Sequence, residues 1–230
     1  LITNDNKYAG ANSNILSIKN ISSVDAGTYF AKIWTVCGDT TVTLKYNLKE
    51  IKLDAAEKSA DSAICETSEI TLKSEFVSSI NTPILYSWYK DGVQLANNYY
   101  YSGVHTKELH IINAKQIHTG IYKLVAFMKD YDNVSAETVT EITVKPLPVI
   151  ESVSAAQELR VGQELNISVV AKGGDLTYTW LKNGVEINGA TSTSLVITSV
   201  SLDDAGEYTC VATNECGSIE SKKINVVVTT

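Results

Sequence analysis

The stretch that decides the fold is Leu195-Val-Ile-Thr-Ser-Val-Ser-Leu-Asp-Asp-Ala-Gly-Glu-Tyr-Thr-Cys210, near the carboxyl end of the chain. Residues 109–124 and 16–31 carry the same pattern. In every copy a leucine lies 13 residues before a tyrosine. The leucine–tyrosine pairs are Leu16 and Tyr29, Leu109 and Tyr122, and Leu195 and Tyr208. Because one spacing occurs three times, we interpret the chain as a tandem repeat.

The pattern predicts two β-strands joined by a tight corner. Leu195 and Ile197 lie two positions apart and therefore share one face of an extended strand. Asp204 is placed to bond to nearby backbone in the corner, and Gly206 relieves the local geometry. Tyr208 then begins the second strand. Side chains two positions apart point to the same face, so the cysteine that ends the stretch should lie beside this tyrosine.

A second motif precedes two of the three corners. Residues 178–185 read Tyr-Thr-Trp-Leu-Lys-Asn-Gly-Val, and residues 86–93 read Tyr-Ser-Trp-Tyr-Lys-Asp-Gly-Val. Asn-Gly and Asp-Gly favour a two-residue hairpin turn, because both of its central residues need positive φ. Tryptophan motif and corner together resemble immunoglobulin domains, in which the tyrosine hydroxyl bonds back to the corner backbone. The fold-defining residues of this resemblance are Trp88, Trp180, Tyr29, Tyr122 and Tyr208.

The resemblance implies an all-β fold of tandem immunoglobulin-like β-sandwiches, of which the first is incomplete. We expect the carboxyl-terminal half of one domain at 1–49, a domain at 50–147 and a domain at 148–230. The first unit has a corner but no tryptophan motif, which indicates a piece of a longer protein or a half-domain completed by another chain. Pro146 and Pro148 mark the second boundary, because proline is excluded from central strands.

Composition and motif content limit the possible functions. A formal net charge of −7 argues against a nucleic-acid partner and against attraction to anionic lipid. No apolar run is long enough to predict membrane insertion in this segment. The sequence contains no phosphate-binding glycine loop, zinc-ligand spacing or nucleophile elbow. It therefore predicts no enzyme, and no catalytic, cofactor-binding or metal-binding residue.

The four cysteines depart from the pairing that joins the two sheets of many immunoglobulin domains. Cys210 occupies the position after the corner, but no cysteine lies near Val169, where its partner would be. We therefore expect Cys210 to be a small buried apolar residue. Cys37 and Cys216 each lie six residues beyond that position and precede a glycine, which predicts hairpin tips. Cys65 precedes a strand at the opposite end of the middle domain.

In a linear array the hairpin tip of one domain faces the base of the domain before it. This arrangement predicts an interdomain disulfide between Cys65 and Cys216, with Cys37 intended for a domain upstream of the chain. The alternative, that all four cysteines are reduced thiols, stays open at this point. Cysteines alone do not fix the redox compartment or the connectivity.

Two sets of aromatic residues are candidate binding surfaces. The middle copy is six residues longer than the last between tryptophan and leucine, and Tyr99, Tyr100 and Tyr101 lie in the extra length. Surface loops often carry binding, and tyrosines offer rigid amphipathic contact area. The alternative is an extra edge strand packed on the sheet. Trp34 and Phe127 are predicted to face outward, either against a neighbouring domain or partner or as scattered exposed aromatics.

The sequence around two cysteines narrows the resemblance. Residues 64–72 (Ile-Cys-Glu-Thr-Ser-Glu-Ile-Thr-Leu) and 213–218 (Thr-Asn-Glu-Cys-Gly-Ser) are similar to immunoglobulin-like repeats of large bacterial cell-surface adhesins of the Bacteroidetes type, exported by type IX secretion. Vertebrate cell-adhesion proteins are the rival family. The resemblance implies an extracellular or cell-surface location and a glycan acceptor at Asp61. It implies as partners the neighbouring domains of the same chain, and another surface protein or a glycan.

The function predicted from these features is a non-catalytic segment of an extracellular multi-domain surface protein, acting as spacer and adhesion repeats. Three alternatives stay open. The first is a ligand-binding module that uses residues 99–101. The second is an accessory part of a secreted hydrolase, and the third is a filament subunit whose half-domain at 1–49 is completed by a neighbour.

Overall fold

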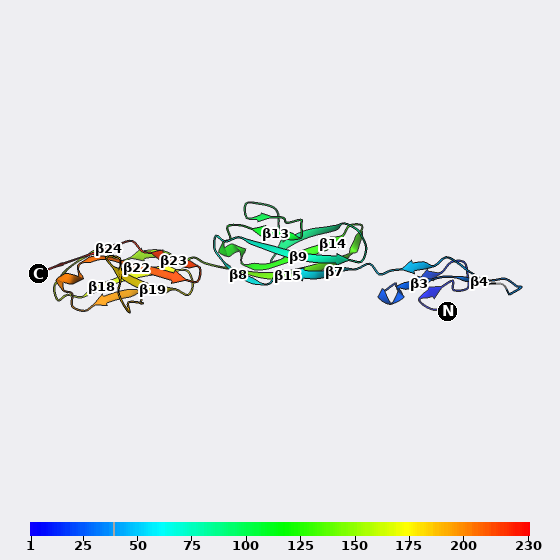
Figure 1. The fold of residues 1–230 in the computed structure, drawn as a ribbon, viewed down its shortest axis with the longest axis horizontal. Helices are drawn as coiled ribbons and strands as arrows, with labels where there is room; N and C mark the ends of the chain where they lie inside the picture. Colours follow the sequence, from blue (N-terminus) through cyan, green and yellow to red (C-terminus); the bar gives the residue numbers. More distant parts are fainter. Residues whose placement is uncertain (39) are drawn as a thin grey trace.

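The computed structural model describes residues 1–38 and 40–230. Figure 1 shows the strands gathered into three groups that succeed one another along the long axis of the molecule. The helices of this part of the chain are single 3₁₀ turns, and none is long and apolar enough to cross a membrane. The molecule is thus an extended array of β-structure.

Residues 53–145 form a sandwich of two sheets. Its strands are β7 (Leu53–Lys58), β8 (Ser62–Cys65), β9 (Ile70–Ser78), β10 (Ile84–Lys90), β11 (Val93–Gln94), β12 (Tyr101–Ser102), β13 (Glu108–Ile111), β14 (Gly120–Met128) and β15 (Tyr131–Lys145). One sheet has the order β11-β10-β14-β15-β8, and the other has the order β12-β13-β9-β7. The pairing of β15 with β8 is parallel, and the other pairings are antiparallel.

Residues 149–229 form a second sandwich. Its strands are β16 (Val149–Val153), β17 (Gln157–Arg160), β18 (Leu165–Lys172), β19 (Thr177–Lys182), β20 (Val185–Glu186), β21 (Ser194–Ile197), β22 (Gly206–Asn214), β23 (Gly217–Glu220) and β24 (Ile224–Thr229). One sheet has the order β16-β18-β21, and the other has the order β17-β24-β22-β19-β20, with β23 also paired to β22. β17 runs parallel to β24, so both sandwiches close one sheet edge with a parallel pair.

One tryptophan lies at the centre of each of these sandwiches. Trp88 and Trp180 are buried, and their indole N–H groups donate to the carbonyl oxygens of Thr106 (3.0 Å) and Ser192 (2.9 Å). The large side chains packed around them include Leu72, Leu109, Tyr122, Leu124 and Ile142 in the middle sandwich and Leu165, Ile167, Tyr208, Cys210 and Ile224 in the last. Each sandwich therefore has its own hydrophobic core, filled from alternate strand positions.

Residues 1–49 pair as three two-stranded sheets. The strands are β1 (Tyr8–Ala9), β2 (Ser17–Ile18), β3 (Gly27–Tyr29), β4 (Lys32–Trp34), β5 (Thr40–Val42) and β6 (Tyr46–Leu48), paired as β1-β2, β3-β6 and β4-β5. Among the described residues of this segment, Asp25 is the one that is buried. It accepts a hydrogen bond from the Tyr8 hydroxyl (3.1 Å) and pairs with the Lys7 ammonium (2.7 Å). The boundaries predicted at 49/50 and 147/148 fall between strands.

The predicted tyrosine corner is present in all three repeats. Each corner contains a 3₁₀ turn, namely η1 (Ser23–Asp25), η2 (Gln116–His118) and η3 (Leu202–Asp204). In each, the tyrosine hydroxyl donates to the carbonyl oxygen of the last turn residue. The pairs are Tyr29 to Asp25 (2.6 Å), Tyr122 to His118 (2.8 Å) and Tyr208 to Asp204 (2.8 Å). This local bond fixes the direction in which the chain enters the next strand.

The middle corner uses a histidine where the other two use an aspartate. The carboxylates of Asp25 and Asp204 accept the backbone N–H three residues before them, both at 2.8 Å. In the middle corner the N–H of Lys115 donates to Nδ1 of His118 at 2.9 Å. A protonated imidazole has no acceptor, so this bond requires a neutral ring with its proton on Nε2. Burial, followed by the nearby lysine charges, lowers the pKa of His118 below its ordinary 6.5.

Removing one corner hydroxyl tests its contribution to stability. We expect Tyr208→Phe to lower the free energy of unfolding of the last sandwich by about 1–2 kcal/mol, because a carbonyl loses its donor inside the protein. Urea denaturation followed by tryptophan fluorescence measures the change. Tyr178→Phe is the matched control, since that half-buried hydroxyl makes no hydrogen bond within residues 1–38 and 40–230. Equal stability of the two variants would contradict the role of the corner.

The histidine in the middle corner predicts that the stability of the middle sandwich depends on pH. Below about pH 6.5 the unfolded chain protonates His118 more readily than the folded chain, so acidification favours unfolding. We expect the urea midpoint of the middle sandwich to fall between about pH 7.5 and pH 5.5. His118→Asn keeps an acceptor oxygen that does not titrate, so its midpoint should fall less. His110→Asn, at an exposed position, is the control and should behave as the wild type. Parallel losses in all three proteins would refute the assignment.

Candidate functional site

The best-defined feature outside the two cores is the junction between the middle and last sandwiches. Cys65 ends β8, and Cys216 lies in the turn between β22 and β23. A disulfide joins them, with their Cα atoms 5.4 Å apart. These are the two cysteines that the sequence analysis predicts to pair across the junction. The alternative of four reduced thiols does not hold in this structure. Sequence reasoning succeeded here because strand order alone places both residues at facing ends of their sandwiches.

Polar contacts surround the disulfide. They are the ion pair of Lys145 with Glu215 (2.6 Å), the bond from the Leu147 N–H to a Glu66 carboxylate oxygen (3.2 Å), and the bond from the Asn214 side-chain amide to the Pro146 carbonyl oxygen (2.9 Å). The sulfur of Cys216 also lies 3.8 Å from the Lys145 carbonyl oxygen. The peptide link at 146–148 and the disulfide therefore cross the junction side by side. An exposed ion pair contributes about 0–1 kcal/mol, so the covalent bond dominates this junction.

The other two cysteines differ in exposure. Cys210 is fully buried in the core of the last sandwich, where Val169 is buried in the same cluster. Burial raises the pKa of the Cys210 thiol to about 11, which keeps it protonated and unreactive at neutral pH. Cys37 is exposed, at the turn that comes after β4. The expectation that Cys210 is a small buried apolar residue is confirmed.

The three consecutive tyrosines have three different environments. Tyr99 is 69% exposed, Tyr100 is half-buried, and Tyr101 is buried. Tyr101 lies in β12, at the edge of its sheet, and its hydroxyl is 3.2 Å from that of Tyr122 in the core. The ring of Tyr100 packs on His118 with 4.7 Å between centroids. Tyr101 is therefore unavailable to a partner, as the edge-strand alternative implies, and Tyr99 is the exposed part of the predicted surface.

Trp34 and Phe127 also differ. Trp34, in β4, is 62% exposed, while Phe127, in β14, is half-buried. Phe127 lies opposite Leu85 of β10, which is 43% exposed, on the outer face of the larger middle sheet. Ile121, six residues before Phe127 in β14, is 51% exposed. Sequence reasoning missed Leu85 and Ile121, although both lie an odd number of residues from an inward-facing aromatic and so point outward.

The last sandwich provides an internal comparison for this outer face. Measured from the tryptophan and the corner tyrosine, the positions of Leu85, Ile121 and Phe127 are occupied in the last sandwich by Thr177, Glu207 and Thr213. Thr177 pairs with Thr213 in the same register in which Leu85 pairs with Phe127. At these three positions the middle sandwich therefore has apolar residues and the last sandwich has polar ones. We name the set Leu85, Ile121 and Phe127 the apolar face.

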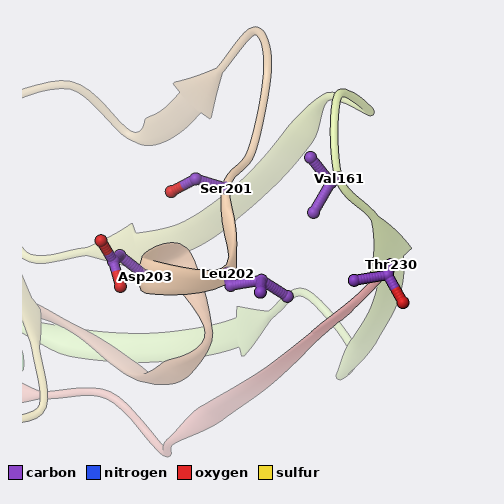
Figure 2. Close-up of a pocket in the computed structure, with 5 residues that line it drawn as sticks. All are labelled: Val161, Ser201, Leu202, Asp203 and Thr230. Atoms are coloured by element: carbon purple, nitrogen blue, oxygen red, sulfur yellow. The ribbon is translucent and has the colours of Figure 1, made fainter.

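A shallow pocket lies beside the corner of the last sandwich. Figure 2 shows a shallow depression of the last sandwich lined by Val161, Ser201, Leu202, Asp203 and Thr230, with the Leu202 side chain directed between Val161 and Thr230. The Ser201 hydroxyl bonds to Asp204 at 2.8 Å, which ties it to the corner. Within the described part of the chain, no group of three His, Cys, Asp or Glu residues could hold a metal ion.

Comparison with known proteins agrees with this fold. The family model described as "Immunoglobulin domain" matches residues 147–214. The chain is 20% identical to an I-band fragment from titin, covering 97% of this chain and 87% of that one with a TM-score of 0.68. Against the structure of Sidekick-1 immunoglobulin domains 1–4 the identity is 20%, the TM-score is 0.58, and the shares covered are 100% and 65%. The chain is therefore built of tandem immunoglobulin-like β-sandwiches.

Among curated proteins the chain is similar to several animal proteins. It is 28% identical to Hemicentin-1 of Homo sapiens over 229 residues, which is 91% of this chain and 4% of the relative. It is 28% identical to the muscle M-line assembly protein unc-89 of Caenorhabditis elegans, covering 98% of this chain and 3% of that protein. A third relative, MAM domain-containing glycosylphosphatidylinositol anchor protein 2 of Mus musculus, is 25% identical, with 93% and 25% covered. The chain thus spans a quarter or less of these relatives.

These relatives bear on the source suggested by the sequence. All three come from animals, and they give no support to the resemblance with bacterial surface repeats. The comparisons favour animal proteins with immunoglobulin domains, a wider group than the vertebrate cell-adhesion proteins that were the rival resemblance.

Thiol counting tests the cysteine assignments together. We expect one thiol to react with Ellman's reagent in the native protein, because Cys37 is exposed and Cys210 is buried. In urea without reductant two thiols should react, and after reduction all four. Cys37→Ser is the control and should remove the native signal alone. Four reactive thiols in unreduced urea would exclude the disulfide.

Proposed function

We propose that this chain is a non-catalytic segment of a multi-domain protein of the cell surface, acting outside the cell as spacer and adhesion repeats. The observation that carries the proposal is the junction, where two sandwiches with separate cores are joined end to end by a disulfide between Cys65 and Cys216. Such a joint preserves the distance and direction between the domains on its two sides. A relative from Gallus gallus, 29% identical over 61% of this chain, is named a cell adhesion molecule and supports the assignment.

The disulfide also supports the location. Structural disulfides persist in oxidising surroundings and are rare in the reducing cytosol. Cys65 and Cys216 are only half-buried, so a reducing compartment would have access to the bond. The relatives include a muscle M-line assembly protein as well as a cell adhesion molecule, and the disulfide favours the second class.

The proposed partners are inferred from the same geometry. The first partners are the neighbouring immunoglobulin-like domains of the same chain. Another surface protein or a glycan would bind to exposed side chains, of which Tyr99 and Trp34 are the most accessible aromatics among those singled out from the sequence. An accessory role beside a hydrolase and a filament completed at residues 1–49 have no specific observation in their favour.

A second candidate function is heterophilic or homophilic binding through the middle sandwich. The observation that favours it is the apolar face, since Leu85 and Ile121 expose 43% and 51% of their surface where the last sandwich has Thr177 and Glu207. Contiguous exposed apolar residues mark interaction surfaces. Leu85 and Phe127 are ladder partners, whereas Ile121 lies six residues from Phe127 along β14, with Lys123 between them. Tyr99 lies elsewhere in the same sandwich and makes a separate candidate.

Small-angle scattering of the whole chain tests the spacer function. We expect the profile of an extended particle whose maximum dimension stays constant over a tenfold range of protein concentration. The double variant Cys65→Ser/Cys216→Ser should give a broader distribution of dimensions, because the junction is then held by the peptide link and exposed polar contacts. Cys37→Ser is the matched control and should match the wild type. A compact wild-type profile would overturn the proposal.

Coated beads test whether the apolar face mediates homophilic binding. Beads that carry the wild-type chain should stay dispersed if the segment does not adhere to itself. Aggregation that Leu85→Thr/Phe127→Thr abolishes, and that Thr177→Ser/Thr213→Ser does not, would instead favour adhesion through the apolar face. The first pair makes the middle face resemble the last one, and the second pair leaves the last face polar.

A further inference from the structure

The disulfide at the junction closes a covalent loop that contains most of both sandwiches. Cys65 and Cys216 are separated by 151 positions in the sequence. The loop between them includes β9 to β15 of the middle sandwich and β16 to β22 of the last. Of these two sandwiches, only β7 and β8 before Cys65, and β23 and β24 after Cys216, lie outside it.

The strands outside the loop form a direct path along the array. In Figure 1 β7 and β8 run along the middle sandwich toward the junction, and β23 and β24 run along the last sandwich from the junction toward the carboxyl terminus. A β-strand already rises about 3.3 Å per residue, close to the limit for a fully extended chain. The covalent route from residue 53 through the disulfide to residue 229 is therefore nearly taut in the folded protein.

We propose that the Cys65–Cys216 disulfide makes these two domains a length-limited tether under tension. Force applied between the ends passes along β7 and β8, across the disulfide, and along β23 and β24. The 151-position loop carries none of that force, so unfolding of either sandwich adds almost no length. The inference rests on the proposed function only in that a surface spacer is expected to bear load.

The chain with a reduced disulfide would respond differently to force, although its folded domains start in the same arrangement. The end of β8 lies beside the end of β15, since Cys65 is the ladder partner of Lys145. Without the disulfide, force leaves the middle sandwich through β15 and the link at 146–148, and it shears the parallel pairs β8–β15 and β17–β24. Once these pairs separate, the whole loop is free to extend.

Single-molecule stretching in optical tweezers tests the tether, with handles attached through peptide tags at both ends of the whole chain. After complete unfolding, the oxidised protein should be shorter than the reduced protein by roughly 500 Å, since about 151 residues of up to ~3.6 Å each stay inside the loop. Residues 1–49 extend equally in both states and cancel in the difference. Cys65→Ser/Cys216→Ser should reach the longer extension without reductant.

A control variant and a chemical reduction complete the test. Cys37→Ser removes an exposed thiol but retains the loop, so its final extension should equal that of the oxidised wild type. If the double variant does not fold, dithiothreitol added to the folded wild type gives the same comparison by reducing the disulfide to two thiols. Equal final extensions of oxidised and reduced protein would overturn the tether. A short end-to-end distance at low force would contradict the spacer function instead.

Discussion

The structure depends on the burial of one tryptophan between the two sheets of each complete sandwich. Trp88 and Trp180 place a large apolar surface in the core, and the single polar group of each ring finds a backbone carbonyl oxygen. The buried indole N–H would destabilise the fold if it lacked that acceptor. Because the sheets are held by this packing, no disulfide is needed between them. Val169 and Cys210 are both buried in the core of the last sandwich without being bonded.

A core that needs no disulfide leaves cysteine available at the ends of the domains. Cys65 and Cys216 lie where a strand ends and where a hairpin turns, outside both cores. The bond between them does not hold either sheet together. It holds one domain to the next, which is the level at which an array of repeats needs stabilisation, since each repeat contacts only its neighbours.

The parts of the fold encoded by local sequence were predictable. The corner depends on a tyrosine four residues after its acceptor, and the hairpins depend on Asp91-Gly92 and Asn183-Gly184, all of which have positive φ as the turn type requires. The pairing of Cys65 with Cys216 was also predictable, because strand order determines which ends of neighbouring domains meet. These inferences need no knowledge of side-chain packing.

Features set by contacts between distant residues were harder to predict. The burial of Tyr101 arises because β12 pairs with β13, and sequence spacing alone leaves open whether an insertion folds onto the sheet. His118 takes the acceptor role that an aspartate has in the other two corners. Its position, four residues before the corner tyrosine, is the one that aspartate occupies in the other two corners. An imidazole can replace the carboxylate as acceptor there only when the ring is neutral. The apolar face emerges only when the strand registers of two domains are compared.

The disulfide also couples the stability of the two sandwiches. If one sandwich unfolds while the other stays folded, the disulfide closes a disordered loop of roughly 70–80 residues, and the lost chain entropy disfavours that state by about 4.5 kcal/mol. If both unfold, the closed loop has 151 positions, and the total rises only to about 5 kcal/mol because the cost grows with the logarithm of loop length. Most of the stabilisation therefore opposes the first unfolding event. Once it has occurred, the second sandwich gains only about 0.6 kcal/mol from the bond, so two domains with separate cores should unfold as a more cooperative pair than their cores alone would dictate.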